Sequence, residues 1–165
     1  MGVPQKNVIR IDCSHNIGLT SLKGCPKQMD DGPTTEFILC GCHGLTSLEG
    51  APEILKKGKF VCQQNSNLKS MKGAPSKCHS LYILQNNVLE SLVGCPKSVS
   101  KFVCHDNINL TSLKGLPTTV RGTIEFYGNG GIEQYDENDF IEAGCTSWKK
   151  LIAKRPINLK DFLWY

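Results

Sequence analysis

Residues 107–117 read Asn-Ile-Asn-Leu-Thr-Ser-Leu-Lys-Gly-Leu-Pro, and the second half of this stretch recurs along the chain. Its pattern, Leu-x-Ser-Leu/Met-x-Gly-x-Pro, occurs five times, starting at Leu19, Leu45, Leu68, Leu89 and Leu110. Repetition at a nearly constant period is typical of a solenoid, in which each repeat is one coil that buries its apolar side chains against its neighbours. A chain of 165 residues has room for one such domain.

Two apolar residues precede each leading Leu, at offsets of eight and six, as Phe60 and Cys62 precede Leu68. Side chains alternate across a strand, so both point to the same side of the chain. The other pairs are Ile11/Cys13, Phe37/Leu39, Leu81/Ile83 and Phe102/Cys104, and a sixth, degenerate copy has Ile124 and Phe126. The pattern predicts a β-rich solenoid of six coils, each giving one strand to a parallel sheet.

An asparagine stands three residues before the Leu in most copies, at Asn16, Asn65, Asn86 and Asn107, and Asn129 holds this place in the sixth copy. A side-chain amide can satisfy backbone groups that are buried at a bend. We therefore expect one hydrogen-bonding amide per coil, stacked in a column. Cys42 interrupts this column in the second coil.

The composition changes after the repeats, which divides the chain into a solenoid at 1–135 and a C-terminal helical cap at 136–165. Asp136 can cap a helix that Gly144 ends, and residues 147–155 read as a second helix closed by Pro156. An open solenoid end needs a cover. The side chains expected to pack on the last coil are Trp148, Leu151, Ile152, Phe162 and Leu163.

The unit Asn-x-x-Leu-Thr-Ser-Leu-x-Gly-x-Pro resembles the bacterial branch of leucine-rich repeats, and is similar to short repeat proteins of bacteriophages and bacteria. The resemblance covers roughly residues 8 to 132. It implies a curved scaffold that presents its strand face to a partner, and it does not identify that partner. Secreted bacterial effectors carry a similar unit, but their Pro directly follows the second Leu, where this chain has Lys, Glu or Val.

The outward strand residues are predicted to form the binding face. The residues seven positions before each Leu are predicted to form one solvent-facing column. Four neighbouring members of this column are apolar, namely Ile38, Val61, Tyr82 and Val103. An apolar centre with a polar rim is the anatomy of a protein interface. The predicted site residues are Ile38, Lys59, Val61, Tyr82, Leu84, Lys101, Val103, His105 and Tyr127. The simpler reading is that β-branched and aromatic residues merely suit strands.

Several functions fit this face. The favoured prediction is a non-catalytic module that binds a protein partner, and the resemblance extends it to a phage-encoded inhibitor of a host defence protein. A nucleotide or other small-molecule sponge would use Lys59, Lys101 and His105 with the aromatic rings. A structural protein that assembles with itself, for instance as a homo-oligomer through the same patch, is the third possibility.

The overall composition favours a cytoplasmic protein, in a bacterial host if the chain is phage-encoded. The 19 basic and 15 acidic residues give a net charge of +4, without a basic run that would track a phosphate backbone. Nucleic acid is therefore not favoured as a partner. No stretch approaches the roughly 20 apolar residues that cross a bilayer, and the N-terminus does not read as a signal peptide.

The sequence predicts no catalytic constellation, no cofactor and no metal site. Most of the nine cysteines occupy repeat positions of small core residues, which is a common role for a free thiol. Only Cys40-Gly-Cys42-His43, with Cys13 and His15 one coil away, has a spacing that suggests zinc. A second ligand pair at fixed spacing is missing, so this possibility stays open and is not favoured.

Overall fold

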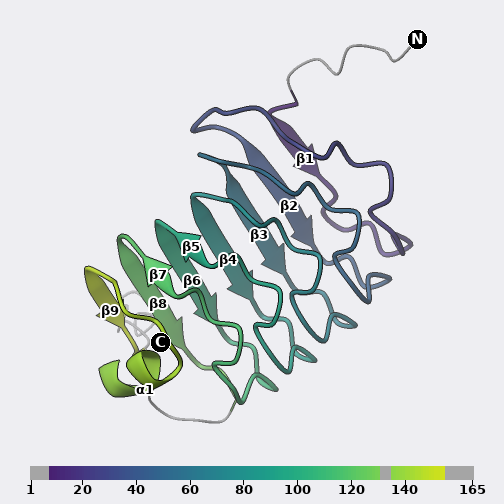
Figure 1. Cartoon of the computed structure of the whole chain (residues 1–165). Helices are drawn as coiled ribbons and strands as arrows, with labels where there is room; N and C mark the ends of the chain where they lie inside the picture. Colours follow the sequence, from purple (N-terminus) through teal and green to yellow (C-terminus); the bar gives the residue numbers. More distant parts are fainter. Residues whose placement is uncertain (1–7, 131–134, 155–165) are drawn as a thin grey trace, which may run out of the picture.

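The computed structural model describes residues 8–130 and 135–154, and there the chain winds into a parallel β-solenoid (Figure 1). The chain makes five turns between the first and the sixth predicted strand. A seven-stranded sheet runs along one side in the order β1-β2-β3-β4-β6-β8-β9. Its strands are β1 (Arg10–Asp12), β2 (Glu36–Cys40), β3 (Lys59–Gln63), β4 (Ser80–Leu84), β6 (Lys101–His105), β8 (Thr123–Tyr127) and β9 (Lys150–Ile152).

All six predicted strands are present, and their parallel pairing is confirmed. Each strand from β2 to β8 in this sheet buries its second and fourth residues, as in Phe60 and Cys62 of β3. The rings of Phe37 and Phe60 stack at 5.3 Å between centroids, so neighbouring coils share one continuous core. This contact explains why a single repeat cannot fold alone.

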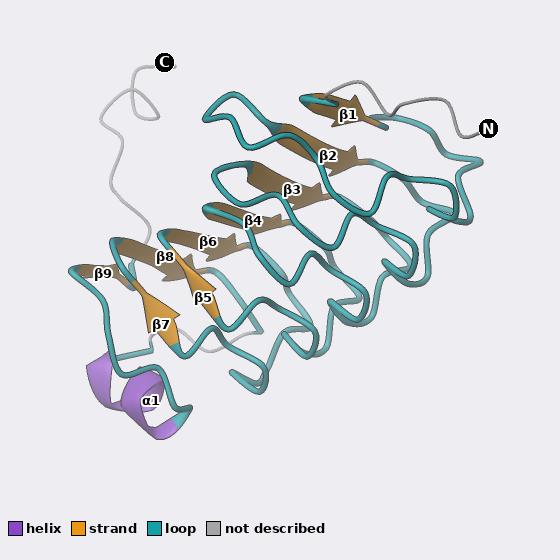
Figure 2. Cartoon of the chain, turned by 45° about the horizontal axis from the view of Figure 1, so that its top comes forward, coloured by secondary structure: helices purple, strands orange, loops and turns teal. Residues whose placement is uncertain are grey.

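A second wall faces the long sheet and carries the short strands β5 (Ser98–Val99) and β7 (Thr119–Val120), which pair in parallel (Figure 2). Each repeat buries one apolar residue on this wall. These residues are Met29, Leu55, Cys78, Val99 and Val120. They close the core from the side opposite the long sheet.

The predicted amide column is confirmed at Asn65, Asn86, Asn107 and Asn129, all of which are buried. The N–H of each residue in the column donates to the Oδ1 of the next, from Asn65 to Asn86 at 3.0 Å and from Asn86 to Asn107 at 2.9 Å. Asn16 does not take part, because it lies exposed in the first coil. At the second coil the column ends with Cys42, whose N–H donates to Asn65 Oδ1 at 2.9 Å.

Cys42→Asn is expected to stabilise the fold by about 0.5–1.5 kcal/mol, because an amide at this position would extend the column by one coil. The Cys42 thiol now donates to the Cys13 carbonyl at 3.0 Å. An amide can donate to the same carbonyl and form stronger hydrogen bonds than a thiol does. The free energy of unfolding from urea titration tests this, with Cys42→Ala as the less stable control. A loss of stability in the Asn variant would contradict it.

After the repeats, the predicted first helix is present as α1 (Glu137–Glu142). Asp136 caps it by accepting from the backbone N–H groups of Asn138 and Asp139, and Gly144 follows its end with a positive φ of 89°. The buried Phe140 packs edge-on against Phe126 of β8, with ring centroids 5.5 Å apart. In the described part of the chain, no helix is long and apolar enough to cross a membrane.

The predicted second helix over 147–155 is wrong, because residues 150–152 form strand β9 instead. β9 pairs in parallel with β8 and places Leu151 beside Ile124. The free edge of β8 offers ladder hydrogen bonds and a place in the core, and this tertiary gain overrides a weak helix propensity. Trp148 and Leu151 pack against the core as predicted. The prediction was wrong for Ile152, which stands beside Glu125 in an outward column. Phe162 and Leu163 lie outside the described residues.

Candidate functional site

The long sheet brings the predicted site residues together in parallel columns on its outward face. The ladder pairs Ile38 with Val61, Val61 with Tyr82, and Tyr82 with Val103. A further column runs along the carboxyl ends of the strands, where Leu84 stands beside His105 and His105 beside Tyr127. The adjacency inferred from the repeat offsets is therefore present in the fold.

Exposure along the central column differs from the prediction at one residue. Ile38, Val61 and Tyr82 are partly exposed, but Val103 is only 3% exposed and is therefore buried. Val103 stands between the larger side chains of Tyr82 and Glu125 in the ladder. An apolar side chain that is shorter than both neighbours is shielded by them.

At the centre of the face, five adjacent strands each contribute one side chain to a row that we call the Tyr82 row. It consists of Glu36, Lys59, Tyr82, Lys101 and Glu125. The Nζ atoms of Lys59 and Lys101 lie 5.9 and 5.7 Å from the centroid of the Tyr82 ring. Lys59 also pairs with Glu36 at 2.6 Å, and Lys101 pairs with Glu125 at 2.9 Å. The two ion pairs hold the cations against the ring.

One member of each ion pair in this row has a shifted pKa. The hydrogen bond from Lys59 lowers the pKa of Glu36 below its ordinary value. The hydrogen bond to Glu125 raises the pKa of Lys101 above its ordinary value. At the first strand, hydrogen bonds from Ser14 lower the pKa of Asp12 to about 2. The polar rim thus carries paired charges of both signs.

The stacked rings of His105 and Tyr127 form the other aromatic element of the face. Their centroids lie 4.7 Å apart with an interplanar angle of 6°. His105 Nδ1 also lies 3.0 Å from a carboxylate oxygen of Asp106. The imidazole is therefore held by its neighbours on two sides.

A groove of about 580 Å³ runs past the carboxyl ends of the strands, where the chain turns inward. The residues that make this turn have positive φ, among them His15, Gln64, Gln85 and Asp106. The lining also includes His43, Ser66, Asn87 and Ile108, and it contains no Lys or Arg. Such a lining offers hydrogen bonds but no Lys or Arg side chain to a phosphate group. We did not predict this groove from the sequence, although a polar residue stands four before the leading Leu in four of the five copies and could have indicated it.

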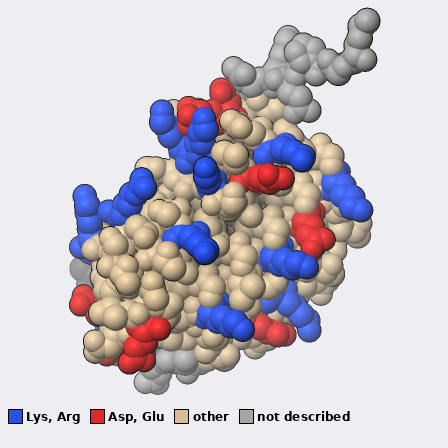
Figure 3. Space-filling view, viewed as in Figure 1, with Lys and Arg blue, Asp and Glu red and all other residues tan. Residues whose placement is uncertain are grey.

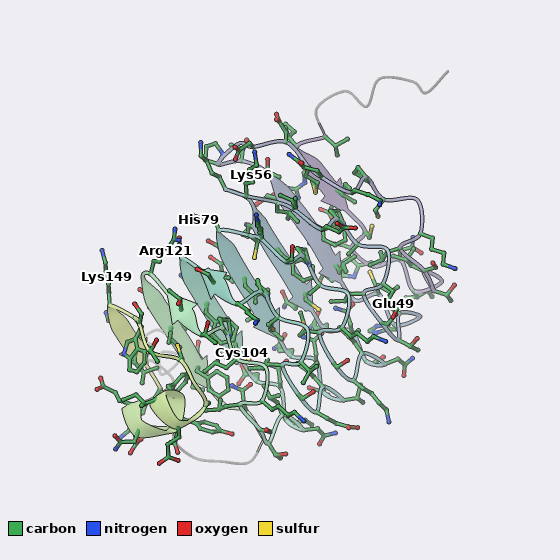
Figure 4. The ribbon with its side chains drawn as sticks, viewed as in Figure 1. Glu49, Lys56, His79, Cys104, Arg121 and Lys149 are labelled. Atoms are coloured by element: carbon green, nitrogen blue, oxygen red, sulfur yellow. The ribbon has the colours of Figure 1, made fainter. Side chains whose placement is uncertain are left out.

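A row of basic residues lies along the opposite ends of the strands and was not predicted. We call it the basic edge, and it consists of Lys56, His79, Arg121 and Lys149, of which Lys56 pairs with Asp31 at 3.3 Å. Figure 4 shows Lys56, His79, Arg121 and Lys149 following one another along one side of the solenoid. Basic side chains gather over the same side in Figure 3, where only a few acidic side chains accompany them. Its members come from different coils, so no basic run marks it in the sequence.

The suggested zinc ligands do not converge. Among residues 8–130 and 135–154, no group of three His, Cys, Asp or Glu side chains could hold a metal ion. The Cys42 thiol bonds the Cys13 carbonyl, and His43 Nδ1 lies 3.1 Å from Ser66 Oγ. All nine cysteines are free, and burial raises the pKa of Cys42 to about 11 and that of Cys62 to about 12. These thiols are poor nucleophiles.

The comparisons with known proteins identify no relative. No protein family matches the chain, and neither a curated protein nor a solved structure is significantly similar to it.

Proposed function

We propose that this protein is a non-catalytic binding module that holds a protein partner on the outward face of its long sheet. The observation that carries the proposal is the Tyr82 row, in which an aromatic ring stands at the centre of the face between two paired cations. Tyrosine is enriched among the residues that dominate binding energy, and a rim of polar groups around such an anchor excludes water. Ile38, Val61 and Leu84 add apolar area beside it.

The partner in this proposal presents acidic groups next to an apolar patch. The basic edge borders the sheet face where strands β3 to β9 begin, and Lys149 and Arg121 are exposed there. Complementary charges raise the rate at which two proteins meet and fix the orientation in which they dock. Association is accordingly expected to slow at high salt.

The leucine-rich-repeat assignment belongs to the same proposal. It is supported by the Leu-x-Ser-Leu/Met pattern together with the buried amide column at Asn65, Asn86 and Asn107. In this view α1 and β9 form the cap of the array, because they cover the core of its last coil. Nine free thiols fit a reducing, cytoplasmic location. On the repeat resemblance alone, the proposal extends to a phage protein that inhibits a host defence protein.

A nucleotide sponge has weaker support than a protein-binding module. Lys59 and Lys101 are already paired with carboxylates, and His105 is stacked on Tyr127. The described lining of the groove at the carboxyl ends of the strands contains no Lys or Arg. On the sheet face, a phosphate group would therefore have to displace existing ion pairs before it could bind Lys59 or Lys101.

Tyr82→Ala is expected to weaken partner binding by about 2 kcal/mol or more, which is roughly a 30-fold loss of affinity. The partner is first captured from a bacterial lysate on the tagged wild-type protein. Its dissociation constant is then measured with the wild type, with Tyr82→Ala and with a control variant. Val93→Ala is the matched control, since Val93 is an exposed apolar residue outside the strands. Equal retention of the same protein by all three forms would contradict the proposed face.

A further inference from the structure

The first coil leaves the end of the core uncovered by any described residue. Ile11 and Cys13 are only partly buried, whereas Phe37 and Leu39, which hold the same places in the next coil, are fully buried. Ile9 and Ile17 of the first coil are 49% and 70% exposed. Exposed apolar side chains beside an edge strand favour association with another chain.

Among residues 8–130 and 135–154, none pairs with the backbone of β1 on the side away from β2. Ile9 and Cys13 face β2, because Glu36 N–H donates to the Ile9 carbonyl at 2.8 Å and Cys13 N–H donates to the Ile38 carbonyl at 3.0 Å. Successive backbone groups alternate between the two sides of a strand. The N–H and C=O groups of Arg10 and Asp12 therefore point away from the sheet, toward the open end.

From these observations we propose that two copies of the chain join at their open ends, with β1 pairing antiparallel to β1 about a two-fold axis at Ile11. In this register Arg10 of each copy stands opposite Asp12 of the other. Both residues turn their free backbone groups to the partner, so the two opposed pairs are hydrogen-bonded pairs of the ladder. Opposite charges directly across an antiparallel ladder stabilise it. Within one chain Arg10 already pairs with Asp12 and Glu36, so the dimer would add a second carboxylate to this cluster or exchange one for another. The segment Arg10-Ile-Asp12 is thus complementary to itself.

The inward side chains fit the same register. The two Ile11 residues face each other at the axis as a non-hydrogen-bonded pair, in which side chains come closest. Ile9 of one copy then stands opposite Cys13 of the other. The incomplete core of each first coil is covered by its counterpart, and an interface of this kind is closed because the same patch serves both copies.

Head-to-tail stacking fits the charges less well. A parallel strand that continued the sheet beyond β9 in register would place Arg10 beside Lys150, because both hold the first position of the ladder. Like charges directly opposed destabilise a ladder. The pairing of two first coils therefore matches the charges, and the growth of a filament does not.

Analytical ultracentrifugation of the full chain, from about 1 µM to about 1 mM, tests the proposal. We expect a monomer–dimer equilibrium for the wild type. Arg10→Asp opposes like charges in both pairs and is expected to raise the dissociation constant at least about tenfold. Exchanging the two residues, Arg10→Asp with Asp12→Arg, restores opposite charges and should restore the dimer. A wild type that stays monomeric, or that grows into filaments, overturns the proposal.

A cross-link checks the register independently. Ile9→Cys places a thiol opposite Cys13 of the second copy, and oxidation should give a disulfide between positions 9 and 13. Within one chain these positions are four residues apart along an extended segment, about 13 Å, which is too far for a disulfide. Val93→Cys is the control that should not form this link. Peptide mass spectrometry identifies the bond, and a dimer that never yields it has another interface.

The dimer would turn both sheet faces to the same side, because the axis stands perpendicular to the sheet. Two binding faces side by side would raise the avidity for a partner that itself has two copies. The oligomeric state can be measured without any partner. A failure of the dimer proposal and a failure of the proposed function are therefore separate results.

Discussion

Asn107→Ala is expected to lower the free energy of unfolding by about 2–5 kcal/mol. The Asn107 Oδ1 atom accepts from the N–H of Asn86 at 2.9 Å, and its Nδ2 group donates to the Ile83 carbonyl at 3.0 Å. Alanine leaves the Asn86 N–H buried without its acceptor and removes the side-chain hydrogen bond to the Ile83 carbonyl, which keeps its ladder partner on β6. The orphaned N–H costs about 1–3 kcal/mol and the other lost hydrogen bond about 0.5–1.5 kcal/mol, which together are a large part of the stability of a domain of this size.

Asn109→Ala is the matched control for this prediction, because Asn109 lies two residues away and is exposed. It is expected to change the free energy of unfolding by less than about 0.5 kcal/mol. Urea titration followed by far-UV circular dichroism measures both variants. Similar losses for the two substitutions would show that the amide column does not hold the coils together.

Gly94→Ala is expected to cost about 2–5 kcal/mol, through two separate causes. Gly94 has a φ of 103°, a conformation that strains any residue with a Cβ atom. An added Cβ would also lie under 3.0 Å from the carbonyl carbon and oxygen of Met71 in the preceding coil. Backbone atoms cannot turn aside as a side chain does, so the stacking of the two coils would have to loosen.

Gly24 isolates the second cause from the first. It holds the same turn position with the same φ of 103°, but no atom lies within 4 Å of the place that an alanine Cβ would take, because no described coil precedes the first. Gly24→Ala is therefore expected to cost only the strain, about 1–2 kcal/mol. Thermal unfolding of the two variants gives the comparison. Equal losses would mean that coil stacking at this turn is looser than the structure indicates.

The repeat region was predictable because its pattern is local and recurs. The offsets from each leading Leu identify the strand around Phe60 and Cys62 as readily as the one around Phe102 and Cys104, and both are buried as expected. The capping residues of α1 were also readable, since Asp136 and Gly144 act on backbone groups only a few residues away. In each case the deciding interactions lie within a single coil, or they recur in the same form in the next coil.

The errors have a common physical cause. Residues 147–155 have a helix-like composition, and β9 forms there because β8 offers an open edge. Val103 stands in an outward column, and its burial depends on the size of Tyr82 and Glu125 on neighbouring strands. Neither the free edge nor the neighbouring side chains can be read from a local pattern.

The sequence by itself determined the repeating coil, its inward columns and the adjacency of the outward residues, because a repeat of nearly constant length brings equivalent positions side by side. The tertiary structure alone decided which groups share a surface. It placed Lys56, His79, Arg121 and Lys149 on one edge, and it left β1 with one side that no described strand pairs with. These features arise between coils, where distances depend on stacking and loop length and no periodicity records them.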